Sequence, residues 1–353
     1  MSYHYLSAFA LPDLEVWFRV PRVRRGRVQV RVGEGYVWDA SARWRRAFPV
    51  EVGAWLEVEL DVGAREPVRG WRVVGRGREL EPQPEVAWLG EVAERMRAYF
   101  RRAGFVEVFP RTLIPWPAPD PHVEAFAVEG RFLHTSPEME MKRLAVRGFR
   151  KMFFLGKVYR RGEEGPWHAE EFLMLEWYEP GAELAALRRR LEGLLRVLTG
   201  RRMRLKEYRW TELAARSLGI REEDLWSEAW YARLRDYGDS PWEALRAWMA
   251  VKVERKLGHE APAWVVGYPA VYGTMAEGGR ILQRGELFWR GIEVAHGYVE
   301  LRDPEEHQRR LGSRFRDFIE EMEADLGPLV GCSVGVERLT ALLRDLPGIR
   351  RLR

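Results

Sequence analysis

The sequence contains a single cysteine, Cys332, among 353 residues. One thiol excludes a disulfide framework and any zinc site built from several cysteines. The chain also lacks an apolar run long enough to span a membrane, and its first residues lack the basic start and cleavage site of a secretion signal. We therefore expect a cytoplasmic protein that makes no membrane contact.

Concentrated positive charge is missing as well. The formal net charge is +5, and residues 1–85 hold 14 basic and 12 acidic side chains, so this segment contributes only +2. Proteins that bind many phosphates usually present a concentrated basic face. The charge pattern weakens a nucleic-acid-binding interpretation, although folding can still bring distant basic residues together.

The length allows two domains of unequal size. The first 80 residues alternate apolar and polar side chains between glycine and proline breaks, which predicts a small β-barrel module of the OB type. Its expected strands are Leu14–Val20, Arg27–Val32, Tyr36–Asp39, Trp55–Val62 and Trp71–Gly75. A proline-containing linker at 81–85 leads into a larger domain at 86–353. That domain opens with a helix at 86–103 and carries a helical insertion at about 183–258.

A strand, a polar loop and a second strand are predicted across residues 151–180. Strand side chains alternate, so Phe172, Met174, Glu176 and Tyr178 share one face of the second strand. A buried carboxylate beside a phenol needs a partner. An aromatic ring and an arginine at the strand ends are suited to clamp a nucleotide base and its phosphate. An ordinary hairpin with a buried Glu–Arg pair explains the same residues.

Two glutamates flank a predicted two-residue turn at Arg290-Gly291. In this hairpin Phe288 pairs with Glu293, and Glu286 lies diagonally across on the same face. Carboxylates placed in this way repel unless a cation lies between them, and Mg²⁺ takes such oxygen ligands together with substrate phosphates. A solvated pair on an exposed face is the alternative. Gly297, farther along the strand, indicates a bulge or a close ligand approach.

Two further segments predict helix starts. A strand ending at Gly335 is expected to turn into a helix with Arg338 in its first turn, where a free helix N-terminus favours phosphate. Thr135 and Glu138 have the spacing of a capping box at the start of another helix. Each of these signals is weak when taken alone.

Together and in this order, the segments resemble class II aminoacyl-tRNA synthetases of the lysyl branch. They are most similar to the stand-alone ligases that attach (R)-β-lysine to elongation factor P, and the likeness covers about residues 86–345. The stretch EFLMLEWY at 171–178 matches that ligase family nearly letter for letter. The resemblance implies an α+β fold in which an antiparallel sheet is flanked by helices.

The resemblance also implies a role for each motif residue. ATP would be bound by Arg160, His168, Glu171, Phe172, Glu286, Glu293, Gly335 and Arg338. Among these, Arg160 and Arg338 are the implied catalytic residues, Phe172 would stack on adenine, and Glu286 and Glu293 would hold Mg²⁺. The amino acid would be held by Ser136, Glu138, Glu176, Tyr178, His296, Tyr298 and Glu300. In that set Glu138 takes the α-amino group and Glu300 takes the distal amine.

The chain departs from the family pattern at two positions. Gly162 stands where the family has a glutamate that reads the adenine amino group, and Glu163 or Glu164 is the candidate replacement. His296 replaces an asparagine that faces the substrate carboxylate. Ala295, by contrast, follows the stand-alone ligases, since the lysyl-tRNA synthetases carry glycine there.

The resemblance implies an ATP- and Mg²⁺-dependent ligase that forms an aminoacyl-adenylate from an amino acid with a distal positive charge. It also implies a homodimer formed through the helix at 86–103 and the strand Phe105–Pro110. Ala295, the 171–178 stretch and the short N-terminal module favour a protein lysine, as on an elongation factor P-like acceptor. Transfer to tRNA is the second hypothesis. A non-catalytic binding or regulatory paralogue is the third, and Gly162 is its only argument.

Overall fold

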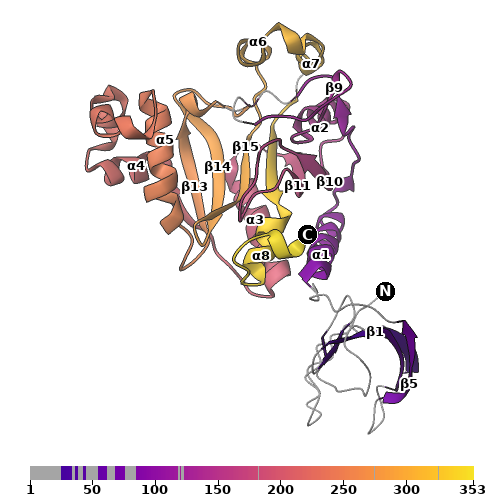
Figure 1. The fold of residues 1–353 in the computed structure, drawn as a ribbon. Coiled ribbons are helices and arrows are strands. Elements are labelled where there is room, and N and C mark those ends of the chain that lie inside the picture. Colours follow the sequence, from indigo (N-terminus) through magenta and orange to yellow (C-terminus); the bar gives the residue numbers. More distant parts are fainter. Residues whose placement is uncertain are drawn as a thin grey trace. The chain divides into compact units, whose positions relative to one another are not determined.

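In the computed structural model, the described residues are the strands within 25–75, as backbone, and residues 85–353 apart from 118–119, 121–122, 182, 274 and 325. The chain divides into two compact units, Met1–Gly90 with Arg351–Arg353, and Glu91–Arg350 (Figure 1). Among the described residues, none of the helices combines the length and the apolar character needed to cross a membrane.

The first unit contains five antiparallel strands: β1 (Arg25–Gly33), β2 (Tyr36–Trp38), β3 (Arg43–Trp44), β4 (Trp55–Asp61) and β5 (Val68–Gly75). They form one sheet in the order β3-β2-β1-β4-β5. The expected strand Leu14–Val20 lies outside the described residues, and β3 was not expected. Closure of this sheet into an OB-like barrel stays a prediction.

The second unit is built on an eight-stranded sheet in the order β12-β13-β14-β15-β16-β11-β10-β6. Its strands are β6 (Val106–Glu107), β10 (Met152–Tyr159), β11 (Glu171–Pro180), β12 (Lys206–Arg209), β13 (Ala263–Pro269), β14 (Ile281–Trp289), β15 (Ile292–Val299) and β16 (Leu329–Gly335). A small second sheet has the order β7-β9-β8, from β7 (Leu113–Ile114), β8 (Ala127–Val128) and β9 (Arg131–Leu133).

The predicted antiparallel sheet is confirmed for the centre of the sheet but not for its two edges. The β10–β11 and β14–β15 hairpins are antiparallel as predicted, but β6 pairs with β10, and β12 with β13, in parallel. In each parallel pair, a long connection that contains at least one helix separates the two strands along the chain, and such a crossover returns the chain in the same direction. The sheet is therefore mixed, and the antiparallel part is its centre.

The strand registers place polar side chains in two rows across the centre of this sheet. One row consists of Glu176, Ser333, His296 and Glu286, and the next consists of Tyr178, Gly331, Tyr298 and Arg284. Directly opposed residues point to the same face, and residues two apart on a strand also share a face. One face of the sheet thus gathers most of the sequence-predicted amino-acid-binding residues.

Eight α-helices lie in the described part of the chain: α1 (Glu85–Arg102), α2 (Glu138–Val146), α3 (Leu184–Thr199), α4 (Trp210–Leu218), α5 (Pro241–Lys252), α6 (Pro304–Leu311), α7 (Arg316–Met322) and α8 (Val336–Leu343). Short 3₁₀ segments are η1 (Glu222–Ser227), η2 (Ala229–Arg233), η3 (Arg235–Tyr237), η4 (Glu254–Lys256), η5 (Ala270–Tyr272), η6 (Ser313–Phe315) and η7 (Arg350–Leu352). Helix α3 packs against β14, β15 and β16, and α8 against β11, β15 and β16.

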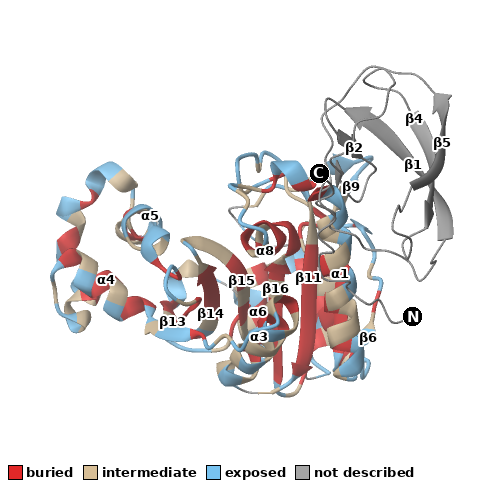
Figure 2. Cartoon of the chain, turned by 90° about the horizontal axis from the view of Figure 1, so that it is seen from below, coloured by how far each residue is buried: buried red, intermediate tan, exposed pale blue. Residues whose placement is uncertain are grey.

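Buried positions concentrate in the central strands and α8 (Figure 2). A core that includes Met141, Phe154 and Phe318 joins α2 and α7 to the sheet. The helices of the predicted insertion pack in two different parts of the unit. Helix α3 lies on the central sheet, whereas α4 and α5 share a separate hydrophobic core with β13 around Trp210 and Trp230. Helix α2 packs against β11, and α7 packs against both α2 and α6.

Candidate active site

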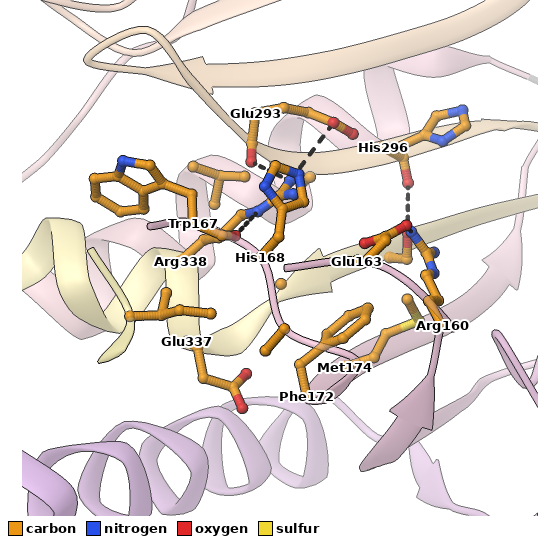
Figure 3. Close-up of a pocket in the computed structure, with 16 residues that line it drawn as sticks. Arg160, Glu163, Trp167, His168, Phe172, Met174, Glu293, His296, Glu337 and Arg338 are labelled. Carbon is orange, nitrogen blue, oxygen red and sulfur yellow. Dashed lines mark hydrogen bonds and ion pairs between the residues drawn. The ribbon is translucent and has the colours of Figure 1, made fainter. Parts of the chain in front are cut away.

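A cavity of about 210 Å³ lies on the polar face of the central sheet. The end of β10, the loop that follows it, β11, β15, β16 and the start of α8 line it (Figure 3). The lining residues are Arg160, Glu163, Trp167, His168, Ala169, Phe172, Met174, Glu293, Val294, Ala295, His296, Ser333, Gly335, Glu337, Arg338 and Ile349. The hairpin predicted from alternation therefore borders a real cavity.

An arginine and an aromatic ring form one end of this cavity. The guanidinium carbon of Arg160 lies 5.3 Å from the centre of the Phe172 ring. Arg160 also donates from Nε to the carbonyl oxygen of Thr135 at 3.3 Å and lies 3.5 Å from a carboxylate oxygen of Glu163. A cation over an aromatic face, with further donor positions free, is suited to receive a phosphate beside a stacked base.

Gly162 occupies a turn that explains the departure from the family motif. Its φ of 76° lies in the left-handed region that favours glycine, and its backbone N–H donates to a carboxylate oxygen of Glu170 at 2.8 Å. The next residue, Glu163, lines the cavity, whereas Glu164 is not among the lining residues. Glu163 is therefore the candidate with the geometry to replace the missing glutamate.

The opposite end of the cavity is formed where β16 turns into α8. Arg338 donates from Nε to the carbonyl oxygen of Trp167 at 3.0 Å and from Nη1 to that of Glu293 at 3.1 Å. Both carboxylate oxygens of Glu337 accept from the backbone N–H of Leu173 at 2.9 Å, which fixes α8 to β11. Burial and the charge of Arg338 lower the pKa of His168 below its ordinary value. Two backbone carbonyls thus hold the guanidinium of Arg338 at this end of the cavity.

A buried lysine lies among acidic side chains beside the second row. Lys142 is fully buried, and its Nζ lies 2.6 Å from Oε1 of Glu138 and 2.7 Å from Oε2 of Glu300. The phenol of Tyr298 donates to Glu138, and that of Tyr178 donates to Oε1 of Glu176 at 2.9 Å. Three carboxyl groups and one ammonium group thus meet on the same face as the cavity.

The charge states of this group follow from burial. Burial, reinforced by Glu138, raises the pKa of Glu176 to about 8, and burial likewise raises the pKa of Glu300 to about 8 despite Lys142. Burial opposes charge on Lys142, but the two carboxylates beside it raise its pKa above the ordinary value. Burial also opposes charge on Glu138, yet Lys142 and Tyr298 lower its pKa. At neutral pH, Lys142 and Glu138 are charged and the other two carboxyl groups hold protons.

Gly331 makes room for this group. A Cβ atom at this position would lie 2.3 Å from Oε1 of Glu300 and 2.6 Å from a ring carbon of Tyr178. Real Cβ contacts are not that short, so a side chain here would displace both groups. Gly331 therefore leaves the space that the Glu300 carboxyl group and the Tyr178 ring occupy.

A third group of side chains, Glu286, Glu293 and His296, lies near the turn between β14 and β15. Each of the three offers one ligand atom, and these atoms lie within 4.8 Å of one another. The phenol of Tyr268 donates to Oε2 of Glu286 at 2.6 Å, and Arg284 donates to Oε1. Two carboxylates at this spacing fit the divalent cation that the resemblance implies. Burial and the charge of Arg284 lower the pKa of His296 to about 4, so its ring is neutral at pH 7.

The structure brings most predicted site residues together and leaves two aside. Glu171 does not line the cavity and instead pairs with Lys157 at 3.0 Å. Ser136 accepts from the backbone N–H of Glu138 at 3.2 Å and so contributes to the start of α2. The capping box is wrong, because Thr135 makes no side-chain cap bond. The carboxylate of Glu138 bonds Lys142 and Tyr298 instead.

The bulge that Gly297 suggested lies elsewhere. The register of β14 and β15 shifts between Leu287 and Phe288, which face Ala295 and Glu293, so Val294 is the extra residue. Gly297 is close-packed, since an added Cβ would lie 2.6 Å from the carbonyl oxygen of Gly331. Because of the bulge, Glu286 lies opposite His296 and not in the register expected from the turn.

Four contributors to the site were missed from the sequence. The pairing of Lys142 with Glu138 could have been predicted, because the two residues are four apart on a helix and side chains at this spacing are neighbours. Tyr268 and Arg284 hold Glu286, but Tyr268 comes from β13, and no local pattern indicates that this strand lies beside β14. Trp167 contributes a backbone carbonyl, which carries no sequence signal.

The sequence is similar to known ligases. A family model described as tRNA synthetases class II (D, K and N) matches residues 81–353. An elongation factor P–(R)-β-lysine ligase homolog from Aquifex aeolicus is 34% identical over 271 residues, covering 70% of this chain and 91% of that protein. The elongation factor P–(R)-β-lysine ligase of Vibrio vulnificus is 30% identical, and the match covers 70% of this chain and 87% of that protein. A lysine–tRNA ligase from Aromatoleum aromaticum is 31% identical, and the match covers 73% of this chain and 61% of that protein.

Proposed function

Because the chain belongs to the class II tRNA synthetases of the D, K and N family, we propose that it converts a lysine-like amino acid and ATP to an aminoacyl-adenylate and transfers the aminoacyl group to a protein lysine. Family membership and the named relatives make it an ATP-dependent aminoacyl ligase that activates an amino acid. The adenylate, the lysine-like substrate and the protein acceptor are the proposed part.

The charge balance of the acidic pocket is the observation that carries the substrate proposal. Once Glu176 and Glu300 lose their protons, three carboxylates with Glu138 among them are balanced only by the ammonium group of Lys142. Buried carboxylates need compensating charge, so a substrate with two ammonium groups stabilises this ionised form of the pocket. The α-amino and distal amino groups of lysine or β-lysine meet this requirement. An amino acid with a neutral side chain supplies one charge, and aspartate adds a further negative charge.

The cavity beside this pocket supports activation by ATP. In the proposed reaction, a carboxylate oxygen of the amino acid attacks the α-phosphorus, and the bond from that phosphorus to the bridging oxygen breaks. Pyrophosphate leaves with the electron pair. Arg160 and Arg338 are placed to stabilise the negative charge on the phosphates. Mg²⁺ bound by Glu286 and Glu293 would supply further positive charge there. The attacking carboxylate is already ionised at neutral pH, so the step needs no general base.

A protein acceptor is supported by the extent of the matches. The chain covers 91% and 87% of two ligases named for elongation factor P, but only 61% of the lysine–tRNA ligase. The parts of a tRNA ligase that are unmatched here are candidates for its tRNA contacts. The second candidate, transfer to tRNA, is favoured by the antiparallel sheet β3-β2-β1-β4-β5, which precedes the matched region and whose order is compatible with an OB barrel.

The proposal includes a cytoplasmic homodimer. Near the start of the matched region, the side chains of Val106 and Phe109 are 53% and 81% exposed. An exposed phenylalanine beside a short edge strand is typical of a surface that another subunit covers. A second copy of the chain is the partner that the family resemblance implies for this segment.

Amino-acid-dependent exchange of labelled pyrophosphate into ATP tests the proposal. The panel contains lysine, β-lysine, ornithine, arginine, asparagine and aspartate. We expect exchange with lysine-like amines and a loss of at least about 100-fold in Glu293→Gln, whose folding is checked by thermal unfolding. Exchange only with aspartate or asparagine would contradict the substrate proposal, and no exchange with any member would contradict the adenylate. Parallel transfer assays with an elongation factor P-like protein and with tRNA identify the acceptor.

A further inference from the structure

The carboxylates of Glu286 and Glu293 are accompanied by a histidine ring that the family pattern does not contain. His296 lies directly opposite Glu286 in the β14–β15 register, so both side chains point to the same face. One ring nitrogen of His296 and one oxygen from each glutamate lie within 4.8 Å of one another. The three side chains thus offer a cation one nitrogen ligand and two oxygen ligands.

The bulge at Val294 creates this arrangement. Glu293 and His296 are three residues apart on β15, and in a regular strand an odd separation places two side chains on opposite faces. The extra residue reverses this parity, so that both side chains reach the same face. Figure 3 shows the carboxylate of Glu293 extending toward the side where the His296 ring lies. A bulge of this type re-aims a side chain next to a functional site.

The imidazole of His296 lies near the Tyr298 ring, and one of its nitrogens is left without a partner among the described residues. That nitrogen, Nε2, is buried. Glu286 already accepts from Tyr268 and Arg284, one on each oxygen, but a carboxylate offers two acceptor positions per oxygen and can ligate while it accepts. These two partners orient the Glu286 carboxylate, as outer hydrogen bonds do for metal ligands. The guanidinium of Arg338 lies 3.6 Å from a carboxylate oxygen of Glu293.

We propose that Glu286, Glu293 and His296 form a mixed nitrogen–oxygen site for a first-row transition-metal dication such as Mn²⁺ or Co²⁺. Mg²⁺ prefers an all-oxygen shell, whereas imidazole favours transition metals, and affinity rises from Mn²⁺ to Co²⁺. His296 therefore shifts the preference of a site whose two carboxylates alone suit Mg²⁺. The inference deepens the proposed function, since the site is the one assigned there to Mg²⁺.

Metal binding measured without ATP or amino acid tests this inference separately from the reaction. Mn²⁺ and Co²⁺ are titrated into the full chain, and pulsed electron paramagnetic resonance on bound Mn²⁺ detects a ligating nitrogen. We expect nitrogen coupling in the wild type and in His168→Asn, whose ring lines the same cavity outside the cluster, and its loss in His296→Asn. We also expect His296→Asn to lower Co²⁺ affinity at least about tenfold while changing Mg²⁺ affinity less than about threefold.

The possible outcomes separate the mixed metal site from the proposed function. Nitrogen coupling that persists in His296→Asn, or equal losses of Co²⁺ and Mg²⁺ affinity, overturns the mixed site. Pyrophosphate exchange with Mg²⁺ but no nitrogen coupling overturns the mixed site and leaves the proposed function standing. Nitrogen coupling without any exchange leaves the mixed site standing and overturns the proposed function.

Discussion

Lys142 lies between Glu138 and Glu300, with its ammonium group within 2.7 Å of one oxygen from each carboxylate. These are the two carboxylates to which the family resemblance assigns the α-amino and distal amino groups of the substrate. The pocket therefore carries its own counter-ion at the place where the substrate amines are expected. A substrate has to share these carboxylates with Lys142, which makes the balance of charge the basis of selectivity.

Replacing Lys142 with methionine should lower the free energy of unfolding by about 3–5 kcal/mol, because it leaves buried carboxylates without their partner. The matched control is Lys157→Met, since Lys157 pairs with Glu171 at 3.0 Å on the surface and exposed pairs contribute about 0–1 kcal/mol. Urea unfolding of both variants measures the difference. Similar losses in the two variants would show that Lys142 is not a buried counter-ion.

Glu300→Gln should reduce selectivity for lysine over asparagine at least about tenfold, which corresponds to about 1.4 kcal/mol. The reason is that the amide no longer compensates the distal ammonium group, whereas the ATP cavity is unchanged. Isothermal titration with lysine, asparagine and ATP measures the three affinities. Glu305→Gln, an exposed position on the helix that follows, is the control and should behave as wild type. Equal weakening of lysine and ATP would contradict this role of Glu300.

The local parts of the site could be predicted from the sequence because their signals are local. Alternation placed Glu176 and Tyr178 on one face, and the turn at Arg290-Gly291 set the pairing of Phe288 with Glu293, which the register confirms. Both turn residues have positive φ, as this hairpin type requires.

The remaining features depend on the packing of distant segments. Gly297 indicated a bulge or a close approach in this strand but not an extra residue at Val294, so the pairing of Glu286 with His296 could not be foreseen. Parallel pairing of β6 with β10 depends on the path of the intervening chain. The burial of Lys142 depends on Glu300, a strand end 158 positions away in the chain, which only the tertiary fold brings near. Sequence motifs thus identify the chemistry more readily than they identify the counter-charges around it.

Binding of a lysine-like amino acid should become tighter as the pH rises from about 6 to 8. The pKa values of Glu176 and Glu300 are raised to about 8, so both carboxyl groups hold protons below that pH, and a cationic substrate binds their ionised forms. Lysine keeps its distal charge throughout this range. Titration calorimetry at pH 7 in buffers of different ionisation enthalpy should detect proton release. Glu176→Gln should release fewer protons, and unchanged release would contradict the assignment.

Replacing Phe109 with aspartate should convert the expected dimer into a monomer without unfolding the chain. The Phe109 side chain is 81% exposed, so the substitution leaves the core of the subunit intact, but a charge buried in a subunit contact is strongly unfavourable. Sedimentation equilibrium at micromolar concentration measures the dissociation constant, which should rise at least about tenfold. Val271→Asp is the control, because Val271 is 53% exposed on η5, outside the predicted contact segment. A wild-type protein that sediments as a monomer, or a Phe109→Asp variant that remains as dimeric as Val271→Asp, would show that this exposed surface is not the subunit contact.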